Sequence, residues 1–536
     1  MIKGFRQIAV LTILSRILGM LRDMAFAYFL GASGLMDGWA IAFKIPNLAR
    51  RLFGEGAAAS SLIPVYSEEL HRDPKRANTL ALTVATTIFV LLSAVTVLGE
   101  VFIWSYYHFV ATHDGTKLKL ALTGVMLPYM VLICVVAVLA GVLNAHRHFA
   151  APAAAPVLLN VLIIVSLFVG GWVLKMPQRA HVFVLAATVL VAGFAQLGMH
   201  LPPLWSRGVH VRPAWDIRSE AFRRVVLLMG PMVLGLTATQ INTLVNDFVA
   251  LWLSGSPEKG TSFTFLGRAI DYPLWEGAVS HLFYAQRLYQ FPLGVLGVSL
   301  ATAIFPVMSA AVAQRDFSDL CRTVSRGLRC TVFVALPATV GLLLVSRPIV
   351  AAILQRGEFT HIDSGKTAVT LSFYALGLVG YFTQQVLTRV FYSLQESGVP
   401  AKSAVLAVFI NLLLNLTLVW SLGTAGLAAA TAICSYVQVV ILATVLQRRF
   451  GRAILAGLGT AIRDTSLATL CMALTVVAAR HLLSGRSTAF VLLAAVSAGT
   501  AVYVGVARVL RIEMLSLLWD RRGRASRHEP GTDGNL

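Results

Sequence analysis

Charged residues, cysteines and catalytic motifs are all scarce in this sequence. Only 13% of its 536 residues are charged, against 57% that are apolar, which excludes a soluble domain of ordinary composition. The five cysteines lack metal-ligand spacing, so we interpret them as small apolar side chains. HExxH, DxD and phosphate-loop motifs are absent, and His146 and His148 lack a paired acidic partner. We therefore expect no enzyme activity and no organic cofactor.

Long apolar runs take the place of these features. Runs of about 20 residues or more predict membrane-spanning helices, because each backbone N–H in hydrocarbon must be satisfied within its own segment. We therefore predict an all-α, polytopic membrane protein of about fourteen helices. The predicted spans are 6–30, 35–64, 78–104, 120–144, 156–174, 182–204, 225–253, 282–312, 328–346, 367–395, 403–420, 424–447, 464–480 and 488–510.

The net charge of +20 is distributed unevenly between the predicted connections. More than twice as many Lys and Arg residues lie on the side of the two termini as on the opposite side, so the positive-inside rule places both termini in the cytoplasm. Because the charge is dispersed among short loops, it does not predict nucleic-acid binding. The polar segment 513–536 is expected to be a disordered cytoplasmic tail.

A weak internal repeat relates the two halves of the chain. RDMAFAYFLG (22–31) aligns with NDFVALWLSG (246–255), and FKIP (43–46) aligns with YQFP (289–292). Such repeats are common in transporters and predict two six-helix lobes around a central cationic cavity, with spans 13 and 14 as additions. The predicted divisions are an N-lobe (1–204), a cytoplasmic linker (205–224), a C-lobe (225–450), two additional helices (451–512) and the tail (513–536).

Several charged residues fall inside the predicted spans. A charged side chain at the centre of a membrane helix costs roughly 2.5 to 3.5 kcal/mol on insertion scales, so it usually faces water or a partner. Arg16 and Asp23 share one helix face, so Asp23 can pair with Arg16 or with Lys44 of the next span. In that next span, Pro46 is expected to loosen the helix, and the glycines of segment 54–56 to bend or end it.

Two interpretations of the basic residues remain open. They are either helix-end side chains and ion pairs that fix packing, which suits Arg389, or groups that line a wet cavity. We favour the cavity for Arg16, Arg22 and Arg287, which lie too deep to reach the headgroups easily. A guanidinium stays charged and binds phosphate oxygens in pairs, so the pattern favours a diphosphate as the substrate group.

Longer segments carry a specific resemblance over nearly the whole chain. They are SRILGMLRD (15–23), DGWAIAFKIPNLARRLFGEGAAASSLIPVYSEE (37–69), APAAAPVLLN (151–160), GP (230–231), YAQRLYQFPLGVLGVSLATAIFPVMS (284–309) and FYSLQESGVPAK (391–402). In these segments the chain resembles the MurJ (MviN) family of lipid II flippases, within the multidrug/oligosaccharidyl-lipid/polysaccharide exporter superfamily.

The resemblance implies a protein of the bacterial inner membrane that moves an undecaprenyl-diphosphate-linked peptidoglycan precursor, lipid II, to the periplasmic leaflet by alternating access. Proteins of cell-wall synthesis are expected as further partners. Spans 13 and 14 would form a groove for the lipid tail. The implied substrate-binding residues are Arg16, Arg22, Asp23, Asp37, Lys44, Arg50, Arg51, Glu55, Asn160 and Arg287. Acidic neighbours of the family's span 8 arginine are replaced here by Gln286 and Gln290, which leaves the pairing of Arg287 open.

The resemblance also implies a sodium site in the second lobe, as in some relatives. Its counterparts here are Asn246, Asp247, Asn411, Asn415 and Thr431. Asn411 and Asn415 are four residues apart and share a helix face, and only Asp247 supplies a carboxylate. The alternative is hydrogen bonding between helices by the same Asn and Thr side chains.

Two further points stay open. The main alternative function is export of another lipid-linked glycan or of drugs, for which a drug exporter would have a less cationic cavity. The segment 254–281 is longer than the family leads us to expect. It is interpreted as a solvated loop, with a periplasmic lid or a docking loop as the alternatives.

Overall fold

The computed structural model describes residues 2–515, except the side chains of residues 2–6, 8, 9, 54–60 and 231–239. The predicted tail therefore lies almost wholly outside the described residues. The α-helices of the described range are α1 (Ile2–Leu30), α2 (Gly34–Ala49), α3 (Ala57–Arg72), α4 (Pro74–Phe109), α5 (Asp114–Met126), α6 (Tyr129–Ala145), α7 (Ala150–Phe168), α8 (Gln178–Trp205), α9 (Glu220–Trp252), α10 (Ala278–Pro292), α11 (Val298–Ala313), α12 (Phe317–Leu354), α13 (His361–Leu376), α14 (Leu378–Ser393), α15 (Gly398–Leu422), α16 (Thr424–Phe450), α17 (Leu458–Leu482) and α18 (Thr488–Val509).

Ten stretches of the described residues are long and apolar enough to cross a membrane, from Pro74–Phe109 to Thr488–Val509. They confirm the prediction of a polytopic helical membrane protein. The other four predicted spans correspond to α1, to α2 with α3, to α9, and to α13 with α14. α13 and α14 are short helices separated at Gly377. The number fourteen therefore stays a prediction.

Two compact units divide the chain. The first contains residues 1–285, 353–370 and 404–430, and the second contains residues 286–352, 371–403 and 431–536. The first unit thus combines the predicted N-lobe with the beginning of the predicted C-lobe. In it α1 packs on α7, α2 on α5, and α3 on α9, and Trp39 is completely buried between Phe26 and Phe43.

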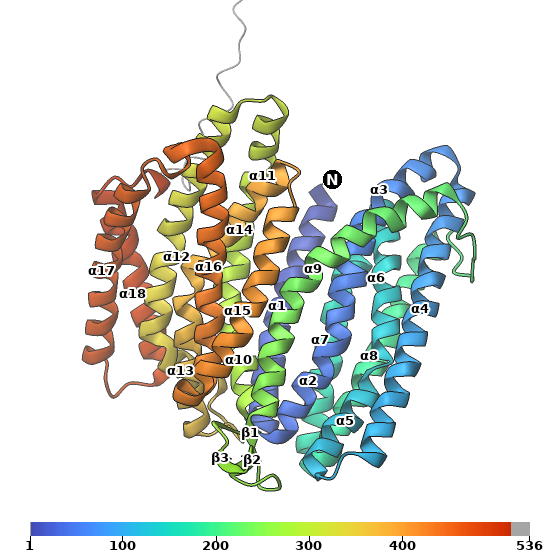
Figure 1. Cartoon of the computed structure of the whole chain (residues 1–536), viewed down its shortest axis with the longest axis horizontal. Helices are drawn as coiled ribbons and strands as arrows, with labels where there is room; N and C mark the ends of the chain where they lie inside the picture. The colour runs from blue at the N-terminus through green and yellow to red at the C-terminus, as the bar shows by residue number, and fades with distance from the viewer. Residues whose placement is uncertain (1, 516–536) are drawn as a thin grey trace, which may run out of the picture. The chain divides into compact units, whose positions relative to one another are not determined.

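The second unit carries the two helices that the repeat does not account for. α17 and α18 lie side by side (Figure 1) and share a buried cluster with α12. In that cluster the Tyr503 hydroxyl donates a hydrogen bond to the Phe333 carbonyl oxygen, and Met472 and Ala495 fill the contact between α17 and α18. These helices are therefore packed against α12 of the second unit.

Two π-helical turns of the described range join consecutive helices, η1 (Arg50–Gly56) between α2 and α3 and η3 (Leu293–Gly297) between α10 and α11, and a third, η2 (Val169–Val173), ends α7. Pro46 precedes η1 and Pro292 precedes η3. A proline removes one backbone donor from the helix, so the turn that follows has to rearrange its hydrogen bonds. The expected loosening of the helix after Pro46 is confirmed, and it places Arg50 and Arg51 in a π-helical turn.

The segment interpreted as a solvated loop contains regular structure. β2 (Ser262–Phe265) pairs antiparallel with β3 (Arg268–Asp271), while β1 (Ser254–Gly255) pairs parallel with β4 (Leu274–Trp275). The two residues between β2 and β3, Leu266 and Gly267, both have positive φ, as a tight hairpin turn requires. The interpretation as a plain loop was incomplete, because Leu-Gly is an unusual sequence for such a turn.

Candidate functional site

Arg22 is buried in the first unit, and each of its three guanidinium nitrogens donates a hydrogen bond. Its Nε and Nη2 atoms donate to Asp23 Oδ1 at 3.1 and 2.7 Å, and its Nη1 donates to Asn160 Oδ1 at 3.0 Å. Asn160 in turn donates to the Ser15 carbonyl oxygen at 3.2 Å. The structure thus joins three predicted site residues of α1 and α7, and it pairs Asp23 with Arg22.

Lys44 of α2 pairs instead with Asp247 of α9. The ammonium group donates to Asp247 Oδ2, and the aspartate side chain is 5% exposed while that of the lysine is 24% exposed. Asp247 was the carboxylate assigned to the sodium site. Its charge is balanced here by Lys44. Asp247, which the repeat aligns with Asp23, therefore also pairs with a basic side chain.

Arg50 and Arg51 begin the π-helical turn η1. Arg50 Nε donates to Asn47 Oδ1 at 3.2 Å, and the exposed Arg51 donates through Nη1 to Gln240 Oε1 of α9 at 3.0 Å. The acceptors in these two contacts are neutral amide oxygens, whereas a guanidinium binds phosphate oxygens more strongly and often in pairs. Glu55 belongs to the same turn, but its side chain lies outside the described residues.

The two remaining arginines lie in different units. Arg16 is exposed on α1, less than two turns before Arg22. Arg287 is half-buried on α10 in the second unit. Its neighbour Gln286, one of the glutamines that replace acidic residues, donates to the Tyr374 hydroxyl at 3.1 Å.

The asparagines of the predicted sodium site form a buried cluster. Asn415 Nδ2 donates to Asn246 Oδ1 at 2.7 Å and to Asn411 Oδ1 at 2.9 Å, whereas Thr431 belongs to the second unit. In this arrangement the side-chain oxygens of Asn246 and Asn411 accept from the Asn415 amide. The contact of Asn246 with Asn415 joins α9 to α15, which corresponds to the alternative of hydrogen bonding between helices. The contact between Asn246 and Asn415 also repeats the contact between Arg22 and Asn160.

Asp37 lies at the other end of α2 and binds the start of α10. Its Oδ2 accepts from Gly277 N at 2.7 Å, and its Oδ1 accepts from Ser280 N and Oγ at 2.7 and 2.6 Å. A carboxylate at a helix N-terminus satisfies unpaired N–H groups and favours the helix dipole. The structure therefore places Asp37 in a contact between α2 and α10, and not beside Arg22.

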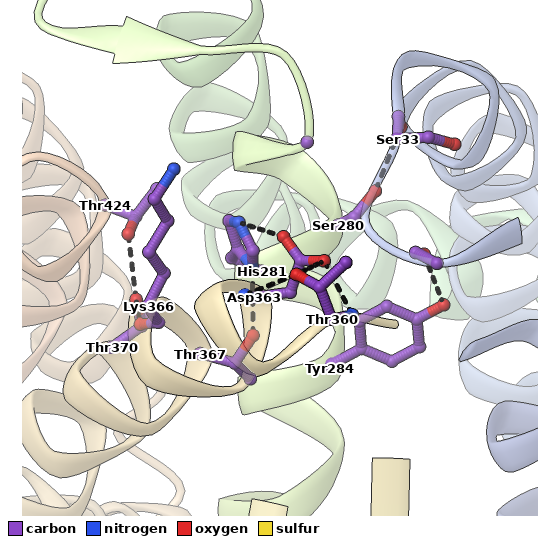
Figure 2. Close-up of polar contacts among 12 residues, drawn as sticks. Ser33, Ser280, His281, Tyr284, Thr360, Asp363, Lys366, Thr367, Thr370 and Thr424 are labelled. Carbon is purple, nitrogen blue, oxygen red and sulfur yellow. Dashed lines mark hydrogen bonds and ion pairs between the residues drawn. The ribbon is translucent and has the colours of Figure 1, made fainter. Parts of the chain in front are cut away.

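Backbone contacts surround this cap. The Tyr284 hydroxyl donates to the Gly31 carbonyl oxygen at 3.0 Å (Figure 2), and Glu358 N donates to the Tyr28 carbonyl oxygen at 3.0 Å. Gly277 has a φ of +92°, and a Cβ there would lie 2.3 Å from the Ala32 carbonyl oxygen. The end of α1 is thus joined closely to the start of α10 and to the loop before α13.

Sequence reasoning missed a second buried group, next to this cap. His281 follows Ser280 and contacts Thr367 and Asp363 of α13. The histidine and the aspartate lie far apart in the sequence, and no motif connects them. The only local signal is the pair Thr360 and Asp363, which has the spacing of a helix N-terminal capping box.

Comparison with known proteins gives a consistent result. The family described as "Lipid II flippase MurJ" matches residues 26–497. A probable lipid II flippase MurJ of Buchnera aphidicola subsp. Schizaphis graminum is 32% identical over 450 residues, which is 82% of each chain. The one from Vibrio cholerae is 30% identical over 448 residues, which is 81% of each chain.

Solved structures share the fold. A structure described as "Lipid II flippase MurJ, inward closed conformation" has a TM-score of 0.74 at 23% identity and covers 95% of this chain and 99% of its own. An inward-facing MATE multidrug transporter of the MOP superfamily has a TM-score of 0.61 at 16% identity, covering 82% and 95%. With its spans, its arginines and these relatives, the chain belongs to the lipid II flippase MurJ family.

Proposed function

We propose that this chain carries lipid II, the undecaprenyl-diphosphate-linked peptidoglycan precursor, from the cytoplasmic to the periplasmic leaflet by alternating access. The curated relatives at about 30% identity are named as lipid II flippases, which supports the substrate. The bacterial inner membrane is the corresponding location. Excess positive charge in the middle of the predicted spans supports the binding of an anionic group there.

The observation that carries the proposal is the balance of charge between residues 16 and 56. Five basic side chains lie within this stretch; Asp23 pairs with Arg22, and Asp247 pairs with Lys44. Asp37 is occupied by the N-terminus of α10. The stretch itself holds three carboxylates, those of Asp23, Asp37 and Glu55, so its formal charge is positive and suits an anion.

The residues have different roles in the proposed mechanism. Arg50 and Arg51 exchange their amide partners, Asn47 and Gln240, for diphosphate oxygens. Arg16 adds charge to this grip, and Arg287 of the second unit is a further substrate-binding residue. Arg22 is held by Asp23 and Asn160, so its guanidinium keeps a fixed position and does not need to reorganise when the substrate enters.

Release requires that the grip weaken while the other end of the carrier opens. Opening at the end of α1 means breaking the contacts of Asp37 with Gly277 and Ser280 and that of Tyr284 with Gly31. The membrane potential acting on displaced charge contributes about 2.3 kcal/mol per charge per 100 mV. Sodium coupling stays a prediction, and no step of this mechanism depends on it.

The proposal is tested by depleting the native flippase of a bacterium and supplying this chain. We expect the parent chain to restore growth, and Arg16→Ala, Arg50→Ala and Arg287→Ala each to lower transport about tenfold or more, as expected for loss of a charge-assisted contact. Arg179→Ala is the matched control, because Arg179 pairs with Asp114 at 3.0 Å on the exposed surface.

Protein levels are measured in the same cells by immunoblotting. Growth of the three variants at the parent rate and at parent protein levels contradicts the assignment of these arginines. Failure of the parent chain itself, present at normal levels, contradicts the proposed substrate.

A further inference from the structure

A histidine is buried in the first turn of α10. The side chain of His281 is 4% exposed and points toward α13 (Figure 2). Its Nδ1 lies 2.9 Å from Thr367 Oγ1, and its Nε2 lies 3.7 Å from Asp363 Oδ1. The second distance suits an ion pair but is too long for a hydrogen bond. The imidazole therefore has one hydrogen-bonded nitrogen and one that faces a carboxylate without reaching it.

Asp363 is fixed in this position by the cap of its own helix. Its Oδ2 accepts from Thr360 N at 3.0 Å and from Thr360 Oγ1 at 2.7 Å, and Asp363 N donates back to Thr360 Oγ1 at 3.2 Å. This reciprocal arrangement is a capping box. It uses one carboxylate oxygen and leaves Oδ1 directed at His281, so the negative charge beside the imidazole is held in place.

The surrounding charges are few. Asp363 and Lys366 of α13 act on the imidazole with opposite signs, and Lys366 is exposed, so solvent screens its charge. From α2, the Asp37 carboxylate binds the preceding residue, Ser280, and adds a second negative charge near the same turn. Tyr284, one turn later on α10, is neutral when its hydroxyl donates to Gly31.

Burial of the side chain disfavours an imidazolium, and the acceptors that surround it oppose this cost. Both of its nitrogens are donors, and both face oxygens that accept, Thr367 Oγ1 and Asp363 Oδ1. Protonation of Nε2 would allow Nε2 and Oδ1 to approach and form a charge-assisted hydrogen bond. Such a bond is shorter and about twice as strong as a neutral one.

We propose that His281 and Asp363 form a proton-binding site, and that protonation of His281 ties the start of α10 to α13. The same turn of α10 carries Gly277 and Ser280, whose N–H groups bind Asp37. Proton uptake therefore stabilises the state in which α2, α10 and α13 are joined at this end, and proton loss favours their separation. Resting on the proposed function, this names the proton as a coupled ion of the transport cycle.

The test is amide hydrogen exchange in the full chain in lipid nanodiscs, without substrate, at about pH 5 and pH 8, which bracket histidine titration. After correction for the intrinsic pH dependence of exchange, we expect the amides of residues 280–284 to be about tenfold better protected at the lower pH, as a charge-assisted bond implies. His281→Gln should remove this difference, because a glutamine does not titrate.

Asp363→Asn is the second variant. Asparagine can still accept from Thr360 and cap α13, but it carries no charge, so we expect the pH difference to be lost while the helix stays formed. His361→Gln is the matched control, since His361 is an exposed histidine at the start of the same helix. It should behave as the parent.

Equal protection of the parent at both pH values, or a pH difference that survives in His281→Gln, overturns the proposal. Because the measurement needs no substrate, it is independent of transport. If the parent fails to move lipid II but shows protection that depends on His281, the proton site stands and the proposed function falls.

Discussion

At the scale of single residues, the charged side chains of the spans divide into those that hold the fold and those that we assign to a ligand. Arg22 was predicted from its depth alone, yet its partner could not be. Helix geometry placed Asp23 on the face of Arg16, whereas the long guanidinium of Arg22 folds back onto the adjacent carboxylate and reaches Asn160. A prediction of ion pairs from the direction of Cβ alone fails here because the arginine side chain is long enough to reach partners on another helix face.

The pair of Lys44 and Asp247 yields a prediction at this scale. Removing one partner of a buried ion pair leaves an uncompensated charge and costs about 3 to 5 kcal/mol, whereas removing both is far milder. We therefore expect Lys44→Met and Asp247→Leu each to lower the thermal midpoint in detergent strongly, and the double variant to recover much of the loss.

A fluorescence-detected thermal melt of the purified variants measures this coupling. Lys117→Met is the control, because Lys117 lies over the Tyr107 ring near the start of α5. Additive losses in the double variant would show that the two charges do not interact.

At the scale of elements, the apolar runs predicted the helices because hydrocarbon leaves the backbone no other partners. The distortion after Pro46 was predictable for a similarly local reason. The strands at residues 262–271 were not, since their turn depends on Leu266 adopting a positive φ, which is rare for a residue with a side chain. The contact of His281 with Asp363 also escaped, because only tertiary packing brings α10 and α13 together.

The start of α10 offers a test of an element end. Gly277→Ala places a methyl group only 2.3 Å from the Ala32 carbonyl oxygen, in addition to the strain of a positive φ. Gly260→Ala is the control, because Gly260 has a φ of +81° but no heavy atom lies within 4 Å of the position that its Cβ would occupy.

We expect Gly260→Ala to cost about 1 to 2 kcal/mol, and Gly277→Ala to cost more and to raise hydrogen exchange at residues 29–33. Both are measured on purified protein, by thermal melts and by exchange. Equal effects of the two substitutions would show that the contact with α1 is unimportant.

At the scale of the whole molecule, the internal repeat is reflected in matching contacts. The alignment places Arg22 opposite Asn246, and each of them binds an asparagine of a later helix, Asn160 in one case and Asn415 in the other. A weak sequence match thus predicted equivalent positions. It could not predict the partners Asn160 and Asn415, because only tertiary packing brings them to these positions.

Topology gives the prediction at this scale. In a chain whose native cysteines are replaced by alanine, Thr112→Cys should react with a membrane-impermeant maleimide in intact cells, and Arg76→Cys should react only after permeabilisation. Both positions are exposed, Arg76 in the first turn of α4 and Thr112 in the connection after α4, at opposite ends of the predicted span 78–104. The reverse pattern of labelling would invert the orientation assigned to the chain.

The π-helical turn η1 has a consequence of its own. A π-turn holds more residues per hydrogen-bonded ring than an α-turn, so it contains an extra residue within a continuous helix. Conversion of the π-turn to α geometry with a shift of one residue would rotate the helix after the turn by about 100° relative to the helix before it. Arg50 and Arg51 are the first two residues of this π-turn. A rotation about the helix axis at this turn would change the direction of two guanidinium groups without bending the helix.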